Sequence, residues 1–475
     1  MPADGILATQ RRFLSHAVMM CHEMHLSRKC IILALTLGLA VSIPVAAFAQ
    51  DTMLGGSSPF VSSSGALRLK VEIKTAFRDS RDVSFTVQNT KTPFPVVMQT
   101  VDPGASAEVP NIGFTLEADL TSDIFARAVV NVLDLYNRNP TSSADKVQVR
   151  EAFVRFGKRV DTLRVADGTS LYFDLGKEPR FSKQITRRLE SYGLWGTAVG
   201  RFEETGAAAG GSFGPHVYWR ASATGGTPLF FRDPNALAGD NGTPERTVGS
   251  TTPVVYNSGF PILYDTIAPD AGGTGKLQLG GGAGFRWNWG ENRRDGIDVL
   301  AWVFRRDLAD RVSLHGTFYG ADLRLLQGVN GISLPVDDDN PTKMEWGVNV
   351  EGRFGPVHVF AQAVKQNIAY LWRQGYEAEI AWRIPLPGLF ASGDQPVVNW
   401  VEPAVRISRI DNLWLNTPGY VAPSVSWDWR KYDFGFRVGI VRGLDVTVEF
   451  ARNDAAIRNG FIHPDEWLVT LRAAF

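Results

Sequence analysis

The sequence predicts an all-β protein, a transmembrane antiparallel β-barrel, and three features of the chain support this fold class. The chain ends on a strand whose alternate residues are apolar and whose last residue, Phe475, is aromatic. An export signal precedes Gln50, and two-faced segments long enough to cross a bilayer at a tilt recur along the rest of the chain. No run of about 18 apolar residues follows Gln50, so spanning helices are excluded. A closed sheet is then the remaining way to pair every backbone group in hydrocarbon.

Residues 1–49 have the pattern of a signal peptide with an upstream extension. Arg28 and Lys29 precede an apolar run from residue 31 to 43, and Ala47-Phe48-Ala49 offers a small-residue cleavage site. A membrane anchor is the alternative, but the apolar run is short for one. We therefore expect this segment to be removed and to contribute nothing to the fold.

Removal of that segment changes the chemistry that is open to the chain. Both cysteines, Cys21 and Cys30, lie within it, so thiol catalysis and thiolate metal ligation are excluded from the mature protein. The remaining 45 basic and 47 acidic residues give a formal charge of −2, which does not favour nucleic acid as a partner.

The first predicted strand runs from Ala66 to Phe77, where apolar residues alternate with Arg68, Lys70, Glu72 and Lys74. Charged side chains on one face cannot lie against lipid, so that face must be wet. The same alternation, in clear or weaker form, predicts strands over residues 112–120, 124–134, 147–156, 171–176, 193–204, 216–223, 276–289, 296–307, 318–326, 344–354, 357–365, 376–384, 400–409, 432–440, 444–450 and 467–475. This is about seventeen segments, and because bacterial single-chain barrels have even strand numbers we predict 16 strands, with 18 as the alternative.

The predicted organisation is a short N-terminal segment over residues 50–65 and a barrel over residues 66–475. The segment 50–65 is too short for a plug domain. Residues 225–275 are rich in Gly, Pro, Thr and Asn and show no sustained period, which predicts one long outer loop. That loop either folds into the barrel or projects from it.

Motifs for catalysis or metal binding fail on their context. Gly210 to Gly214 matches G-x-S-x-G but lies between predicted strands, where a nucleophile elbow needs a strand before it and a helix after it. The acidic run from Asp337 to Asn340 lacks the glycine and final glutamate of a calcium loop. The histidines that remain are dispersed: His216, His315, His358 and His463. We expect no cofactor, no metal and no enzymatic activity.

A basic segment follows the strand at residues 171–176. It contains Lys177, Arg180, Lys183, Arg187 and Arg188, against only Glu178 and Glu190. Further basic or acidic residues on expected lumenal faces are Arg68, Lys70, Glu72, Lys74, Arg127, Arg150 and Arg155.

The region before this segment resembles a known family. Glu151 to Gly157, followed by Phe173-Asp174-Leu175-Gly176-Lys177, resembles the strand pair that precedes the constriction loop of Gram-negative general and phosphate-selective porins. The match is local; elsewhere the chain agrees in length, signal peptide and closing strand. It departs from the family in a short loop and in having no acidic cluster between Lys177 and Tyr192.

The resemblance implies a homotrimer in the outer membrane, surrounded by membrane lipid and lipopolysaccharide, with Phe475 read by the barrel-assembly machinery. It also implies that Arg180, Lys183, Arg187 and Arg188 form the pore constriction. The expected function is passive diffusion of small hydrophilic solutes and ions, with a preference for anions because a basic loop raises the potential of a narrow lumen.

Alternatives remain open for both the charges and the function. The basic residues would lose their selectivity role if they simply pair with Glu72, Glu151, Glu178 and Glu190. A substrate-specific uptake channel is a second functional class, and an adhesin or enzyme built on a barrel scaffold is a third.

Overall fold

The computed structural model describes most of the chain after residue 59. The described ranges are 60–62, 65–81, 84–88, 95–99, 104–132, 147–158, 168–184, 187–198, 203–226, 229–231, 247–248, 254–256, 262–265, 276–289, 295–307, 312–315, 342–368, 370–386, 390–392, 395–413, 428–457, 460–463 and 465–475. The signal peptide predicted over residues 1–49 therefore lies outside the described residues.

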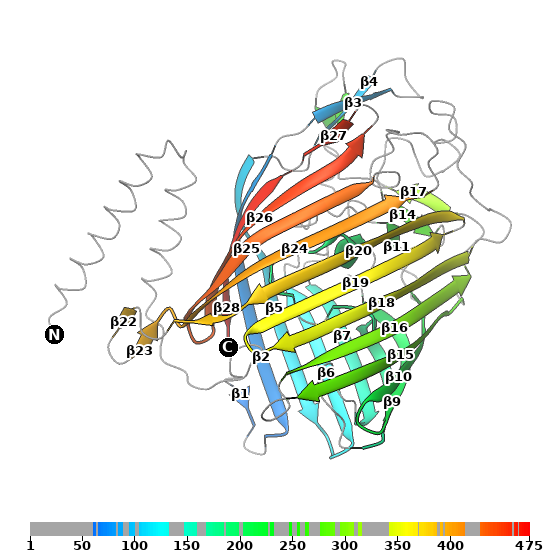
Figure 1. The fold of residues 1–475 in the computed structure, drawn as a ribbon, viewed down its shortest axis with the longest axis vertical. Helices are drawn as coiled ribbons and strands as arrows, with labels where there is room; N and C mark the ends of the chain where they lie inside the picture. The colour runs from blue at the N-terminus through cyan, green and yellow to red at the C-terminus, as the bar shows by residue number, and fades with distance from the viewer. Residues whose placement is uncertain are drawn as a thin grey trace. The chain divides into compact units, whose positions relative to one another are not determined.

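Sixteen long strands form one closed antiparallel barrel, as the sequence predicts (Figure 1). In order around the barrel they are β2 (Leu67–Ser80), β5 (Gly104–Asp119), β6 (Ile124–Val132), β7 (Val147–Gly157), β8 (Ser170–Pro179), β9 (Glu203–Phe213), β10 (Val217–Thr224), β15 (Gln278–Trp289), β16 (Asp295–Asp307), β18 (Thr342–Phe354), β19 (Val357–Ile368), β20 (Leu371–Trp382), β24 (Trp400–Asn412), β25 (Trp429–Val441), β26 (Leu444–Ile457) and β28 (Glu466–Ala474). Each pairs with the next, and short strands β1 (Phe60–Val61), β21 (Ile384–Pro385) and β27 (Gly460–Ile462) add to their edges.

The barrel closes where the last strand meets the first. β28 pairs antiparallel with β2, and the backbone N–H of Val71 donates to the carbonyl of Phe475 at 3.1 Å while that of Phe475 donates to Val71 at 2.9 Å. This pairing leaves neither strand as a free edge, which is what a bilayer requires of a sheet.

The alternation read from the sequence sets the two faces of the wall. On β25, Phe434 and Phe436 are exposed on the outer face, whereas Lys431 and Asp433 on the opposite face are completely buried. Polar side chains therefore fill the inside and apolar side chains cover the outside, the reverse of a soluble protein.

The two ends of the barrel differ in their connections. Residues 214–216, 355–356 and 442–443 join strands tightly at the end where the chain terminates, which we call the short-turn end. The opposite end carries long connections such as 413–428 and is called the long-loop end. There are two longer connections at the short-turn end, residues 158–169 and residues 383–399, and the latter contains the hairpin β22 (Phe390–Ser392) and β23 (Gln395–Val397). A tight turn between β19 and β20 is the exception at the long-loop end. Long loops are typical of the extracellular side.

One predicted strand is wrong, and several strands, including β2, β5, β20 and β26, are longer than predicted. Residues 193–204 contain the short helix α3 (Leu194–Ala198), and the strand that was expected there begins only at Glu203. β2 continues to Ser80 and so adds Arg78 to the inner face. The predicted strand at 318–326 and the acidic run at 337–340 lie outside the described residues. Among the residues described, no helix is long and apolar enough to cross a membrane.

A β-bulge at Arg150 was not predicted. Val129 pairs with Glu151 and Val130 pairs with Val149, so Arg150 is an extra residue in β7. The residues after a bulge alternate in the opposite sense to those before it. This is why Arg150 and Arg155, five positions apart, both belong to the inner face.

The long connection at 225–275 is described at Gly225 and Gly226 and at four short strands: β11 (Leu229–Phe231), β12 (Thr247–Val248), β13 (Val254–Tyr256) and β14 (Ile262–Asp265). β13 pairs with β4 (Pro95–Gln99), which pairs with β3 (Ser84–Gln88), and β14 pairs with β17 (Val312–His315). Connections of the long-loop end are thus paired with one another.

Candidate functional site

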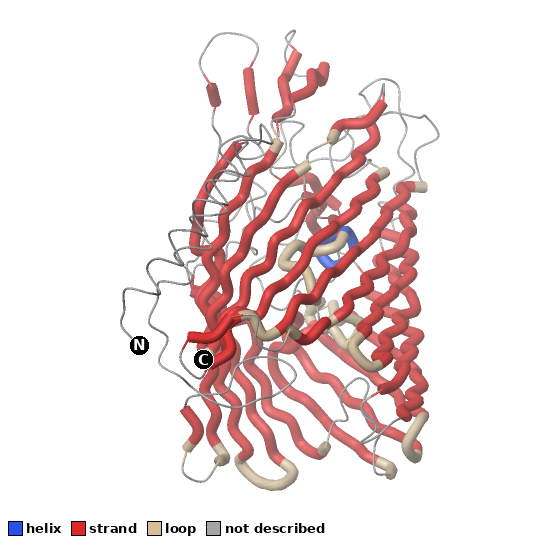
Figure 2. The backbone as a smooth tube through the Cα atoms, turned by 60° about the vertical axis from the view of Figure 1, so that its left-hand side comes forward, coloured by secondary structure: helices blue, strands red, loops and turns tan. Residues whose placement is uncertain are grey.

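An internal loop, residues 180–198, is the main feature of the barrel lumen. It leaves β8 at the long-loop end and turns inward, and Figure 2 shows α3 inside the ring of strands. Its residues bond to side chains of β2, β18, β20, β24, β25 and β26. The loop is therefore fixed to about half of the wall, opposite the strand from which it starts.

The first anchor is Arg180, which is fully enclosed. Its guanidinium lies 2.5 Å from the Glu345 carboxylate and 3.4 Å from that of Glu204, and it stacks 3.9 Å from the ring centre of Phe304. Burial alone would lower the pKa of Arg180, but the two carboxylates outweigh it and raise that pKa. Arg180 stays charged, and its charge is used in holding the loop.

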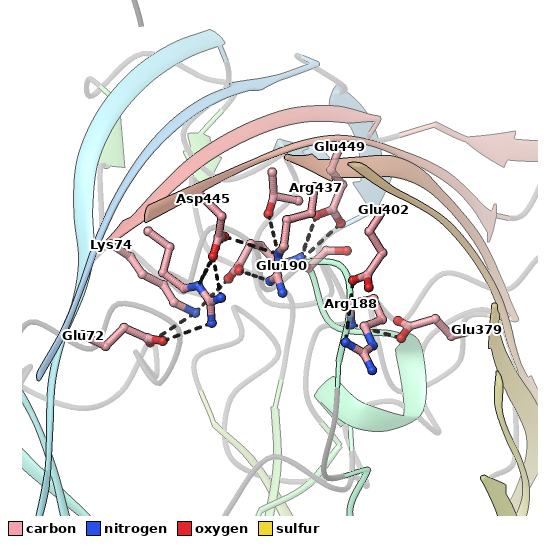
Figure 3. Close-up of polar contacts among 12 residues, drawn as sticks. Glu72, Lys74, Arg188, Glu190, Glu379, Glu402, Arg437, Asp445 and Glu449 are labelled. Atoms are coloured by element: carbon pink, nitrogen blue, oxygen red, sulfur yellow. Dashed lines mark hydrogen bonds and ion pairs between the residues drawn. The ribbon is translucent and has the colours of Figure 1, made fainter. Parts of the chain in front are cut away.

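The second anchor is Arg188, where both backbone and side chain meet the wall. Its backbone N–H donates to Glu379 at 3.0 Å, and its guanidinium lies 3.7 Å from Glu402 (Figure 3). Burial lowers the pKa of Arg188, and Glu402 offsets this only in part because Arg383 and Arg437 are also near.

Glu190 is the third anchor and the point where the loop meets the closing strands. Its carboxylate accepts hydrogen bonds from Lys74 at 2.8 Å and from Arg437 at 2.9 Å. Its own backbone N–H donates to the carboxylate of Glu449 at 2.9 Å (Figure 3). Burial would raise the pKa of Glu190, but Lys74 and Arg437 outweigh it and lower that pKa far below its ordinary range. Glu190 is thus an ionised link between loop and wall.

The last part of the loop is held through its backbone. The N–H of Trp195 donates to Glu377 at 3.1 Å, and that of Leu194 donates to Ser408 at 3.3 Å. A Cβ at Gly193 would overlap the carboxylate of Glu377, so any larger residue there would have to displace that side chain. In the other direction, Lys431 donates to the carbonyl of Tyr192 at 2.7 Å.

Apolar packing and one buried ion network complete the attachment. Trp195 is 2% exposed and belongs to a cluster with Trp302 and Trp429. Arg406 is fully buried between Asp433 at 2.9 Å and Glu379 at 3.3 Å, and it also donates to Ser191 of the loop. The acidic groups that the loop itself lacks are therefore on the wall that it touches.

The wall from β2 to β7 meets the loop at Lys74, but its other ion pairs near the short-turn end are partly exposed. Arg127 bonds to Glu117 at 2.7 Å and to Glu151 at 2.8 Å. Arg68 lies 3.3 Å from Glu117, and Lys70 lies 3.9 Å from the same carboxylate. Arg68 also binds Asp119 at 2.7 Å, so three cations share three carboxylates in this part of the wall.

The two members of these pairs differ in exposure. The side chain of Lys70 is 45% exposed and that of Arg127 is 33% exposed, while Glu117 between them is 12% exposed. Glu72 and Asp119 are exceptions, being more exposed than the bases they pair with. Elsewhere the base is also the more exposed member, in Lys183 with Glu203 and in Arg472 with Asp445.

The predicted site residues fall into two groups. Arg68, Lys70, Glu72, Arg127 and Lys183 are partly exposed, whereas Lys74, Arg150, Arg155, Arg180 and Arg188 are mostly or fully enclosed by partners. Arg187 is partly exposed and stacks 3.6 Å from the ring centre of Tyr192.

Arg150 and Arg155 are held by wall residues. Arg150 binds Glu203 at 2.8 Å, and Arg155 makes two bonds to Asp174 at 2.7 and 2.9 Å. Of the pairings that the sequence offered as an alternative, Arg127 with Glu151 and Lys74 with Glu72 and Glu190 are present.

Several residues that hold the loop were not among the predicted site residues. Glu345, Glu377, Glu379, Glu402, Arg406, Arg437 and Glu449 all stand on inner faces. Their alternation with apolar residues predicted an inner position, but nothing local identifies the loop as their partner. In the parts of the chain that the structure describes, no cluster of three or more histidine, cysteine or acidic residues is arranged to hold a metal ion.

Comparison with known proteins agrees on the fold. OprB of Pseudomonas putida superposes with a TM-score of 0.51 at 9% identity, over 90% of this chain and 100% of that one. The outer-membrane channel DcaP of Acinetobacter baumannii gives 0.45 at 13% identity, over 89% and 100%, and an anion-selective porin from Comamonas acidovorans gives 0.43 at 9%, over 86% and 99%. No family model and no curated protein matches the sequence. The chain has the fold of outer-membrane porins.

Proposed function

We propose that the protein is a water-filled channel for passive diffusion of small hydrophilic solutes and ions, with a preference for anions. The observation that carries the proposal is the unequal exposure of the lumenal ion pairs. Along β2, β5 and β6 the cations Lys70 and Arg127 are more exposed than Glu117, with which both pair, whereas Asp119 is more exposed than its partner Arg68.

Unequal exposure matters because two opposite charges that are equally exposed to the lumen largely cancel each other's effect on a passing ion. When the carboxylate lies at the base of the pair and the cation at its tip, a passing ion meets the positive end first. Low-dielectric walls on all sides limit screening, so even modest charges bias which ions enter. Lys183 and Arg187, which are partly exposed on the internal loop, would add to this field.

The same proposal covers the finer expectations about surroundings and assembly. The barrel would lie among membrane lipid and lipopolysaccharide, after removal of residues 1–49 and insertion that reads Phe475. It would associate as a homotrimer and catalyse no reaction. Trimeric forms occur among similar structures, in OmpT of Vibrio cholerae.

A substrate-specific uptake channel is the second candidate, and the fixed loop favours it. The loop of residues 180–198 is attached to the wall through both buried side chains and backbone amides, and a loop held in this way would narrow the lumen. Single-channel conductance separates the two candidates: a general pore gives a large conductance that solutes leave unchanged, and a specific channel gives a small one that its solute blocks.

Reversal potentials in a salt gradient across a planar bilayer test the anion preference. The informative variants are Lys70→Gln and Arg127→Gln, because both cations are exposed, rather than Arg180, which is enclosed. Wild type should favour the anion, and each variant should move the permeability ratio towards the cation. Arg430→Gln, which changes a cation on the outer face of the barrel, is the matched control. An unchanged ratio in the two lumenal variants would overturn the assignment.

A further inference from the structure

The internal loop carries two aromatic side chains that are partly exposed, Phe181 near its start and Tyr192 just before α3. Trp195 of the same loop is only 2% exposed and packs in a buried cluster. Because the loop lies inside the ring of strands, as Figure 2 shows for α3, the exposed parts of Phe181 and Tyr192 face the interior of the barrel. A solute that passes the loop can therefore meet an aromatic ring.

Tyr192 is stacked with a cation of the same loop. The guanidinium carbon of Arg187 lies 3.6 Å from the centre of the Tyr192 ring, and Arg187 is itself partly exposed. The comparable stack of Arg180 on Phe304, at 3.9 Å, is enclosed, because these two residues are 6% and 1% exposed. We call Arg187 with Tyr192 the planar stack, since it brings a flat cation and an aromatic ring together where both reach water.

The backbone at both members of the planar stack is fixed to the wall. Lys431 donates to the carbonyl of Tyr192 at 2.7 Å, and the N–H of Arg188, the residue after Arg187, donates to Glu379 at 3.0 Å. A site whose groups are already ordered loses less conformational entropy when a ligand binds. The planar stack is thus held in one place before any solute arrives.

A closed ring of ion pairs lies beside the planar stack. Each of its three cations lies within 3.6 Å of two of its three carboxylates, and the members in order are Glu72, Lys74, Glu190, Arg437, Asp445 and Arg472 (Figure 3). Arg187 is close enough to act electrostatically on Lys74 and Glu190. Because the ring is neutral, the charge of Arg187 is added to it and favours an anion at this position.

We propose that the planar stack binds small aromatic carboxylates, of which benzoate is the simplest, as they pass the internal loop. The inference rests on the proposed channel function and specifies one class of solute for it. The solute ring lies over the face of the Arg187 guanidinium that is turned away from Tyr192, so that the cation is held between two rings. The carboxylate of the same solute is attracted by the positive charge.

This recognition needs both properties of the solute. An aliphatic acid has the charge but offers no π-face for the guanidinium, and a neutral aromatic compound has the ring but not the charge. An aromatic carboxylate has both, so it stays at the loop longer than either. The channel would then distinguish these solutes from other anions of the same size.

Block of the single-channel current tests this preference. The purified full chain in a planar bilayer is titrated with benzoate, with cyclohexanecarboxylate, which has the same charge and nearly the same size, and with the neutral compound benzamide. Wild type should be half-blocked by benzoate at a concentration about two- to fivefold lower than by cyclohexanecarboxylate. Benzamide should not block the current.

Two substitutions locate the preference at the planar stack. Tyr192→Leu removes the ring that orients the guanidinium, and Arg187→Lys keeps the charge but removes the flat guanidinium. Each should abolish the difference between the two acids. Tyr376→Leu, which changes an exposed tyrosine on the outer face of β20, is the matched control and should retain the difference.

Equal block by the two acids in wild type, or no block by either, would overturn the proposal, as would a benzoate preference that survives both substitutions. The comparison in wild type involves no variant, so a variant that fails to fold does not obscure it. Reversal potentials recorded on the same channels test the anion preference separately. A preference for cations together with a retained benzoate preference would contradict the proposed ion selectivity but not the planar stack.

Discussion

The two sides of the lumen contain the same kind of ion pair, arginine with a carboxylate, but the pairs differ in how deeply they are buried. On the side of β18 to β26, arginines and glutamates are buried beneath the internal loop and hold it by bonds such as Arg406 with Asp433. On the side of β2 to β7, pairs such as Arg127 with Glu117 stand partly in water. Burial decides the role of each pair. A buried, or dry, pair stabilises the structure because removal of one partner leaves the other as an uncompensated buried charge. A partly exposed, or wet, pair contributes little stability but affects the electrostatic potential in the lumen.

The largest expected effect comes from breaking a dry pair. Arg406→Ala removes the buried cation that lies 3.3 Å from Glu379, and it leaves Asp433 paired with Lys431 alone. We expect a loss of about 3–5 kcal/mol in the free energy of unfolding. Urea unfolding of the detergent-solubilised barrel measures it, and a loss no greater than that of an exposed pair would contradict the dry role of this wall.

The Glu190 link is expected to give a smaller loss with a distinct pH dependence. Glu190→Gln removes charge-assisted bonds to Lys74 and Arg437, which should cost about 1.5–3 kcal/mol at pH 7. Because the pKa of Glu190 is lowered in the folded state, its contribution is present above the unfolded pKa of about 4.3 and is lost only as pH falls through the lower folded value. Unfolding of wild type and variant at several pH values tests this, and a difference that already vanishes near pH 5 would refute it.

Close approach of loop and wall predicts an effect at a glycine. Gly193→Ala places a Cβ against Glu377, which should cost about 1–3 kcal/mol and displace the loop. Gly281→Ala is the control, because a Cβ there meets nothing within 4 Å. Unfolding together with single-channel conductance distinguishes displacement of the loop from a general loss of stability. Equal behaviour of the two variants would mean that the loop is not held where described.

The smallest effect on stability is expected on the wet side. Arg127→Ala should lower the free energy of unfolding by about 1 kcal/mol or less, since its side chain is 33% exposed. The same change should nevertheless shift ion selectivity towards cations. If Arg127→Ala instead caused a large loss of stability and left the reversal potential unchanged, the assignment of Arg127 to ion selectivity rather than to stability would be wrong.

The barrel wall could be predicted from the sequence because each strand carries its own evidence. Alternation put Arg68, Lys70, Glu72 and Lys74 on one face of β2, and the last residues identified the closing strand. The error at residues 193–204 arose because apolar residues of α3 pack inside the lumen and imitate a strand.

The loop attachments could not be predicted, since they join residues far apart in the chain. Arg180 and Glu345 are separated by 165 positions, and only closure of the barrel brings them together. The bulge at Arg150 likewise has no local signal, although it decides which residues of β7 face inward. Composition predicted a basic loop, but only the structure distinguishes the enclosed Arg180 from the exposed Lys183.

Accessibility of single cysteines tests most directly whether the pore runs along β2 to β7 and is closed beneath the loop. The chain is cysteine-free after residue 30, so Lys70→Cys and Ser408→Cys each introduce a unique thiol on the wet and the dry side. With a water-soluble, negatively charged thiol reagent added to channels in a bilayer, we expect Lys70→Cys to react rapidly and to change the current, and Ser408→Cys to remain unmodified. Reaction of Ser408→Cys at the same rate would contradict the account.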